Sequence, residues 1–154
     1  MTNIGVIGGA GYVGLVTGVG LAALGHKVTS MDLDQSRIEM LRKGSSAVYE
    51  EGLEAILRDL IEKDQISFTE NQLYTVRNSD ALFIAVGTPS LDDVAADLSA
   101  VIAVAEQLRE EIDKYTVIVV KSTVPVGTTS VITEILSQKL TESEDFDVVS
   151  NPEF

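Results

Sequence analysis

Short apolar runs rich in β-branched residues recur along the chain, and more polar stretches separate them. Most of these runs are nearly continuous in hydrophobicity rather than alternating, which is typical of parallel strands covered on both faces. The pattern predicts six strands, which begin at Ile4, Lys27, Ile66, Ala81, Thr116 and Phe146.

The stretches between the runs have the spacing and the end signals of helices. The first helix is expected to begin at Tyr12 and to end at Gly25, since glycine readily adopts the left-handed conformation at a helix C-terminus. Four more are expected over residues 35–42, 50–64, 97–115 and 128–140, with Asp97 placed as an N-cap. This alternation across residues 1–154 predicts one α/β domain of the Rossmann type, an open, mostly parallel, doubly wound sheet of about six strands with helices on both faces.

Charge and composition narrow the partners that the chain can have. It has 11 Lys and Arg residues against 24 Asp and Glu residues, a net charge of −13 that would repel nucleic acid and anionic membrane surfaces. The absence of cysteine excludes a thiolate metal site and a cysteine nucleophile from this stretch, and we expect no metal site. No basic leader and no apolar run of membrane-spanning length is present, so a cytoplasmic protein is expected.

A glycine-rich stretch, "IGVIGGAGYVGL", joins the first predicted strand to the first predicted helix. Gly9, Gly11 and Gly14 have the G-x-G-x-x-G spacing of a dinucleotide-binding loop. We expect Gly9 to permit the tight turn, Gly11 to let a pyrophosphate approach the backbone, and Gly14 to let the helix lie close to the strand. An additional Gly8 either lengthens the strand or loosens the turn. The predicted cofactor contacts in this loop are Gly9, Ala10, Gly11, Tyr12, Val13 and Gly14.

An acidic residue follows at the distance expected of a ribose-binding group. Asp32 ends the second apolar run, 18 positions after Gly14, and its carboxylate can accept from both hydroxyls of an adenosine ribose. A 2′-phosphate there would meet a like charge, which predicts NAD rather than NADP as the cofactor. Arg37 is included among the cofactor-binding residues, and its guanidinium keeps NADP open as an alternative.

Four further stretches carry a resemblance to a known family: "GYVGLVTGVGLAALGHKV", "LFIAVGTPS" followed by "ADLSAV", "KSTVPVGTT" and "SNPEF". In order and spacing they resemble the N-terminal half of the nucleotide-sugar dehydrogenases, the UDP-glucose/GDP-mannose dehydrogenase family, and most closely those that oxidise UDP-glucose. The resemblance covers essentially the whole chain. It implies that residues 1–154 are an NAD-binding domain and that a central helix and a UDP-sugar-binding domain lie outside this sequence.

The resemblance also implies roles for residues that follow three of the predicted strands. The loop of Val86, Gly87, Thr88, Pro89 and Ser90 would lie against NAD, and Gly87 permits close approach of the backbone. Ser122 would contact NAD, Thr123 would help to hold a water at the reacting centre, and Glu153 would act as the acid/base through that water. Turn formation by Pro89, helix capping by the hydroxyls and an ordinary surface position for Glu153 are the structural alternatives.

For the whole enzyme, the resemblance implies oxidation of the small molecule UDP-glucose to UDP-glucuronate with two NAD, by a homo-oligomer. The thiol that captures the aldehyde in this family is absent here, so we expect this chain to bind NAD without completing the reaction. A GDP-mannose or UDP-N-acetylmannosamine dehydrogenase domain is one alternative. A stand-alone NAD-sensing regulatory module is another, although such a module has no need for "KSTVPVGTT" and "SNPEF".

Overall fold

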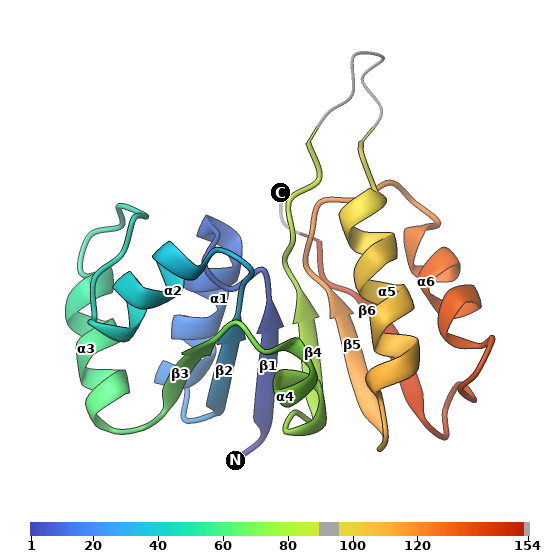
Figure 1. Cartoon of the computed structure of the whole chain (residues 1–154), viewed down its shortest axis with the longest axis horizontal. Helices are drawn as coiled ribbons and strands as arrows, with labels where there is room; N and C mark the ends of the chain where they lie inside the picture. Colours follow the sequence, from blue (N-terminus) through green and yellow to red (C-terminus); the bar gives the residue numbers. More distant parts are fainter. Residues whose placement is uncertain (90–95, 153–154) are drawn as a thin grey trace.

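A computed structural model describes residues 1–89 and 96–152 and contains a six-stranded sheet in the order β3-β2-β1-β4-β5-β6. Every neighbouring pair of strands is parallel. The strands are β1 (Asn3–Ile7), β2 (Lys27–Met31), β3 (Ile66–Thr69), β4 (Ala81–Ile84), β5 (Thr116–Val120) and β6 (Phe146–Ser150) (Figure 1). The order reverses between β1 and β4, as in a Rossmann fold, and the predicted fold class is confirmed.

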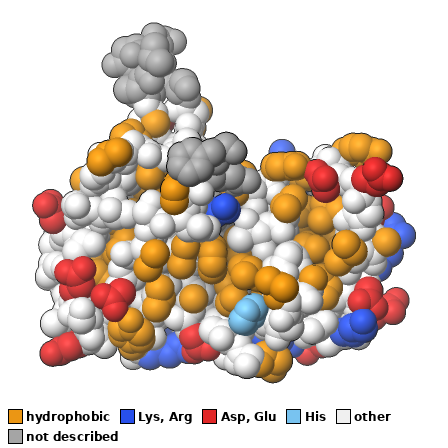
Figure 2. Space-filling model, turned by 180° about the vertical axis from the view of Figure 1, so that it is seen from behind, with side chains coloured by type: hydrophobic (Ala, Val, Ile, Leu, Met, Phe, Trp, Pro, Cys, Tyr) orange, Lys and Arg blue, Asp and Glu red, His pale blue; other side chains and the backbone are white. Residues whose placement is uncertain are grey.

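Helices cover both faces of the sheet (Figure 1). Two apolar cores lie between the helices and the sheet. One core lies under α1 (Tyr12–Ala23), α2 (Gln35–Arg42) and α3 (Leu53–Glu62), and the other under α4 (Gln72–Arg77), α5 (Ser99–Glu111) and α6 (Thr128–Leu136). Successive side chains of β1 point to opposite faces of the sheet, so Val6 packs in the first core and Ile7 in the second. Seen from behind, hydrophobic side chains also form a band at the surface (Figure 2).

The helix α4 was not predicted from the sequence. It has six residues, too few for a helical repeat of apolar positions to show, and its start signal is Asn71, whose side chain accepts a hydrogen bond from the Tyr74 N–H. The expected helices over 50–64, 97–115 and 128–140 are present but shorter. At the start of α5 the N-cap position is Leu98, while Asp97 accepts from the Ser99 N–H at 2.9 Å.

Within the described ranges, no helix is both long and apolar enough to cross a membrane.

Candidate functional site

A cavity of about 480 Å³ opens at the carboxyl ends of the strands, where the strand order reverses. Open α/β sheets bind their ligands at this position, because loops diverge there to opposite faces of the sheet. Its described lining comes from the ends of β1, β2 and β4 and from helices α2, α4 and α5: Ile7, Gly8, Gly11, Met31, Asp32, Leu33, Arg37, Gln72, Ala85, Val86, Gly87, Ala100, Ala103, Val104 and Gln107.

Gly8 forms the turn that leads from β1 into the glycine loop. Its φ of +84° lies in the left-handed region, and a Cβ on it would lie 2.7 Å from the Ala85 carbonyl oxygen. The N–H groups of Gly8 and Gly9 both donate to the Met31 carbonyl, at 3.0 and 2.9 Å. Since β1 ends at Ile7, the additional glycine does not lengthen the strand. The turn therefore depends on Gly8, whereas the sequence had suggested Gly9.

The glycines of the motif allow close packing around the start of α1. A Cβ on Gly9 would lie 2.8 Å from the Cβ of Ser30, and one on Gly14 would lie 2.2 Å from the Gly8 carbonyl oxygen. Gly11 is the N-cap of α1 and provides no side chain to cap the first turn. The N-terminus of α1 therefore lies beside the cavity without a side-chain cap, as a pyrophosphate-binding helix requires.

Asp32 lines the cavity at the end of β2, and the backbone holds its carboxylate in place. Oδ2 accepts from the Ala10 N–H of the glycine loop at 3.0 Å, and Oδ1 accepts from the Asp34 N–H at 3.1 Å. Each carboxylate oxygen can accept a second hydrogen bond. Asp32 can therefore orient the glycine loop and bind the two hydroxyls of a ribose at the same time.

Asp34 begins α2 and holds the side chain of Arg37. Its carboxylate accepts from the Ser36 hydroxyl at 2.6 Å and from the Arg37 N–H at 3.1 Å, and Arg37 Nε lies 3.3 Å from Oδ2. The hydrogen bonds from Ser36 and from the Arg37 backbone, together with the Arg37 charge, hold the pKa of Asp34 below its ordinary value. The one cationic side chain in the described lining of the cavity is thus ion-paired.

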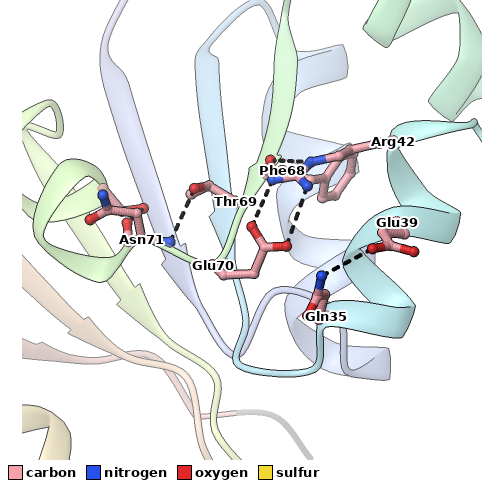
Figure 3. A network of polar contacts seen from close by, with 8 residues as sticks. Gln35, Glu39, Arg42, Phe68, Thr69, Glu70 and Asn71 are labelled. Atoms are coloured by element: carbon pink, nitrogen blue, oxygen red, sulfur yellow. Dashed lines mark hydrogen bonds and ion pairs between the residues drawn. The ribbon is translucent and has the colours of Figure 1, made fainter.

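The other end of α2 is fixed to β3 by a bidentate ion pair (Figure 3). The Arg42 guanidinium donates to both carboxylate oxygens of Glu70, at 2.8 and 3.3 Å, and through Nε to the Phe68 carbonyl at 3.0 Å. A planar guanidinium restrains direction as well as distance in such a contact. This contact helps to fix the position of α2, whose N-terminus carries Asp34 and Arg37 beside the cavity.

Two hydroxyl groups join the loops that follow β4 and β5. The buried Ser122 donates through Oγ to the Val86 carbonyl at 2.7 Å and to the Ile84 carbonyl at 3.3 Å. Thr88 donates through Oγ1 to the Thr123 carbonyl at 2.8 Å. Both hydroxyls already have partners in the protein, so their hydrogen bonds position the backbone of the two loops.

The remaining predicted site residues lie at or near this edge of the sheet. Ala10 is buried, Val13 is half-buried, and Pro89 and Thr123 are exposed. The Tyr12 hydroxyl donates to the Glu50 carboxylate at 2.8 Å. Ser90 and Glu153 lie outside the described residues. Among the residues that the structure covers, no group of three or more His, Cys, Asp or Glu side chains could hold a metal ion.

Comparison with known proteins decides the family. The sequence matches, over residues 2–154, the family model described as the NAD binding domain of the UDP-glucose/GDP-mannose dehydrogenase family. The chain belongs to this family. The predictions of a nucleotide-sugar dehydrogenase family and of NAD as the cofactor are confirmed.

Members of the UDP-glucose/GDP-mannose dehydrogenase family are similar to the chain over its whole length. UDP-glucose 6-dehydrogenase YwqF of Bacillus subtilis is 42% identical over 99% of this chain and 34% of its own length. The structure of a UDP-glucose dehydrogenase from Pyrobaculum islandicum has a TM-score of 0.91 and 41% identity, over 100% of this chain and 36% of that one. A GDP-mannose dehydrogenase from Pseudomonas aeruginosa has a TM-score of 0.92 and 34% identity, over 98% and 36%. The chain spans about a third of the length of these relatives.

The geometry fits the cofactor of this dehydrogenase family. A side chain at Gly8 would collide with the backbone of Ala85, just after β4, and one at Gly14 would collide with the Gly8 carbonyl, so the glycines allow the loop to pack closely against β4 and the start of α1. The fixed carboxylate of Asp32 lies at the same cavity. The uncapped start of α1 can bind the pyrophosphate of NAD, and the Asp32 carboxylate can accept from the hydroxyls of the adenosine ribose.

Several residues that line the cavity were not predicted from the sequence. Most are apolar, such as Ile7, Met31 and Val104, and apolar residues in a strand or helix carry no pattern that separates a cavity wall from a core. Gln72 was missed together with its short helix, and Gln107 lies in what reads as a solvated helix face. Only their placement around the cavity identifies them.

Proposed function

We propose that this chain is the NAD-binding part of an enzyme that oxidises UDP-glucose to UDP-glucuronate. The observation that carries the proposal is the cavity at the strand-order reversal, with its glycine loop and the fixed Asp32 carboxylate, in a chain similar to UDP-glucose dehydrogenases. Residues 1–154 would form the whole NAD-binding domain, and the sugar-binding part would lie outside this sequence. A cytoplasmic location and a homo-oligomeric enzyme remain predictions.

The residues of this chain would divide the binding of NAD between the two halves of the sheet. The glycine loop with the start of α1 would hold the pyrophosphate, and Asp32 the adenosine ribose. The loops after β4 and β5, which the Ser122 and Thr88 hydrogen bonds join, would place the nicotinamide half. Bound NAD accepts the hydride in such an oxidation.

Conversion of a primary alcohol into a carboxylate takes two oxidations, each of which removes a hydride and a proton, and a final hydrolysis in which water supplies the second carboxylate oxygen. Two NAD would take the hydrides. We propose that Glu153 accepts protons through a water that Thr123 helps to hold, since a positioned carboxylate can serve as a general base. The family's cysteine, which would bind the aldehyde covalently before the second oxidation, has no counterpart in this sequence. Because the sugar-binding part would also lie outside this sequence, we expect no formation of NADH from UDP-glucose by this chain alone.

Similarity extends across the family, so the identities to its members bear on which nucleotide sugar the enzyme uses. Relatives that act on UDP-glucose are 42% and 41% identical to the chain, and the GDP-mannose dehydrogenase is 34% identical. The higher identities favour UDP-glucose, and GDP-mannose is the second candidate.

Calorimetric titration of this chain with NAD and with NADP tests the cofactor site. We expect NAD to bind about tenfold or more tightly than NADP, because a 2′-phosphate would approach the Asp32 carboxylate. Asp32→Ala should weaken NAD binding and reduce the preference. Asp59→Ala, which removes an exposed carboxylate of α3 paired with Lys63, should change neither. Equal affinities of the unchanged chain for NAD and NADP would overturn the role of Asp32.

A further inference from the structure

Arg37 lies where a cation would be expected to bind NADP. It is the one cationic side chain in the described lining of the cavity, and it shares this end of the cavity with Asp32. An arginine close to the ribose-binding position is the usual means of accommodating a 2′-phosphate, because its planar guanidinium matches phosphate oxygens. By residue type alone, Arg37 would therefore weaken the preference for NAD.

The structure gives this guanidinium another partner. Arg37 Nε lies 3.3 Å from Asp34 Oδ2, while the opposite oxygen of the same carboxylate accepts from the Arg37 N–H and from the Ser36 hydroxyl. The Asp34 N–H in turn donates to Asp32 Oδ1. Asp34 is thus fixed both to the ribose-binding carboxylate and to the arginine.

The ion pair is exposed, with 48% of the Arg37 side chain and 43% of the Asp34 side chain accessible to solvent. Such pairs add little to stability. Their effect on selectivity does not depend on their stability, because a phosphate that approaches Arg37 must first displace the Asp34 carboxylate from the guanidinium.

We infer that Asp34 is a determinant of cofactor specificity, which favours NAD over NADP by holding the Arg37 guanidinium away from a 2′-phosphate. This inference depends on the NAD site proposed above. It also gives Arg37 a conditional role, since Arg37 would bind a 2′-phosphate only when Asp34 loses its charge.

The test uses two ligands that differ only at the 2′ position, AMP and adenosine 2′,5′-bisphosphate, titrated calorimetrically into this chain. We expect Asp34→Asn to shift the ratio of the two affinities about five- to tenfold toward the bisphosphate, as a new charge-assisted contact would, with AMP affinity changed less than about twofold. Asparagine is also a good N-cap, so α2 should keep its start, which circular dichroism would check.

The substitution Arg37→Ala distinguishes an effect that Asp34 exerts through Arg37 from direct repulsion of the phosphate by the Asp34 charge. Added to Asp34→Asn, it should return the ratio to that of the unchanged chain, whereas alone it should move the ratio less than about twofold, since Arg37 is already engaged. Asp59→Asn, which removes the same charge from the Asp59–Lys63 pair, is the matched control and should leave the ratio as it is.

Two results would overturn the inference. One is an unchanged ratio in Asp34→Asn, and the other is a gain in bisphosphate affinity that survives Arg37→Ala, because direct repulsion by Asp34 would then explain the selectivity. Failure of the unchanged chain to bind AMP or NAD would instead contradict the cofactor site itself.

Discussion

At the residue scale, close packing of the glycine loop leaves the Ser30 hydroxyl buried, which lowers the stability of the fold. It is fully buried in β2, and a Cβ on Gly9 or Gly18 would lie within 3.0 Å of its side-chain atoms. Its hydroxyl has no hydrogen-bond partner among the described residues. A buried polar group without a partner is destabilising, because it gives up its hydrogen bonds to water.

We expect Ser30→Ala to raise the free energy of unfolding by about 1 kcal/mol, measured by urea denaturation. Ser79→Ala is the matched control: Ser79 is as deeply buried, but its hydroxyl donates to the Thr75 carbonyl at 2.6 Å, so its removal should lower stability by a similar amount. A loss of stability in Ser30→Ala would mean that the hydroxyl has a partner, such as a buried water.

In the glycine loop, the sequence predicted the motif but not the conformation of each glycine. The spacing of Gly9, Gly11 and Gly14 predicted a dinucleotide loop, yet adjacent glycines are equivalent in a sequence. Only the backbone shows that Gly8 has the positive φ and that Gly9 packs against Ser30. Arg37 illustrates the same limit, because its presence was evident and its pairing with Asp34 was not.

At the scale of elements, the loops that follow β4 and β5 behave as one unit. Ser122 lies just after β5, and its hydroxyl donates to the carbonyl of Val86, just after β4, at 2.7 Å and to that of Ile84, the last residue of β4, at 3.3 Å. We expect its hydroxyl to fix the loop at residues 86–87 beside the nicotinamide half of NAD. It would then act as a positioning residue and not through direct contact.

Calorimetry with NAD and ADP-ribose tests this role, because ADP-ribose lacks the nicotinamide. Ser122→Ala should weaken NAD binding about fivefold, as the loss of one net hydrogen bond of about 1 kcal/mol would, and leave ADP-ribose binding nearly unchanged. Ser79→Ala, remote from the cavity, should affect neither ligand. Equal weakening of both ligands in Ser122→Ala would show a general structural role instead.

The elements themselves were largely predictable, for identifiable reasons. Apolar runs marked all six strands, and helical spacing of apolar positions, with end signals for some of the helices, marked five helices. Gly25 lies just beyond the end of α1 and has a φ of +95°, as expected of a C-terminal cap. The missed α4 is shorter than two helical turns. The ends of α5 and α6 were overestimated because their polar last turns resemble the loops that follow.

At the scale of the whole molecule, side chains at the amino edge of the sheet join three strands. Asp80, just before β4, accepts from the Asn3 N–H of β1 at 3.0 Å and from Lys114 Nζ, ahead of β5, at 3.0 Å. The pKa of Asp80 lies below its ordinary value of 3.8. The larger cause is the hydrogen bond from the Asn3 backbone, and the second is the contact with Lys114.

This shift predicts how Asp80 contributes to stability as a function of pH. Because its pKa is lowered in the folded chain, the contribution is complete above about 3.8, the unfolded value, and is lost as the pH falls through the folded value. Asp80→Asn should therefore lower the melting temperature at neutral pH, and the difference from the unchanged chain should shrink as the pH falls below 3.8. Lys114→Gln, which leaves the Asn3 contact intact, should have a smaller effect of the same form. A difference that stays constant from neutral to acidic pH would show that Asp80 acts through packing and not through its charge.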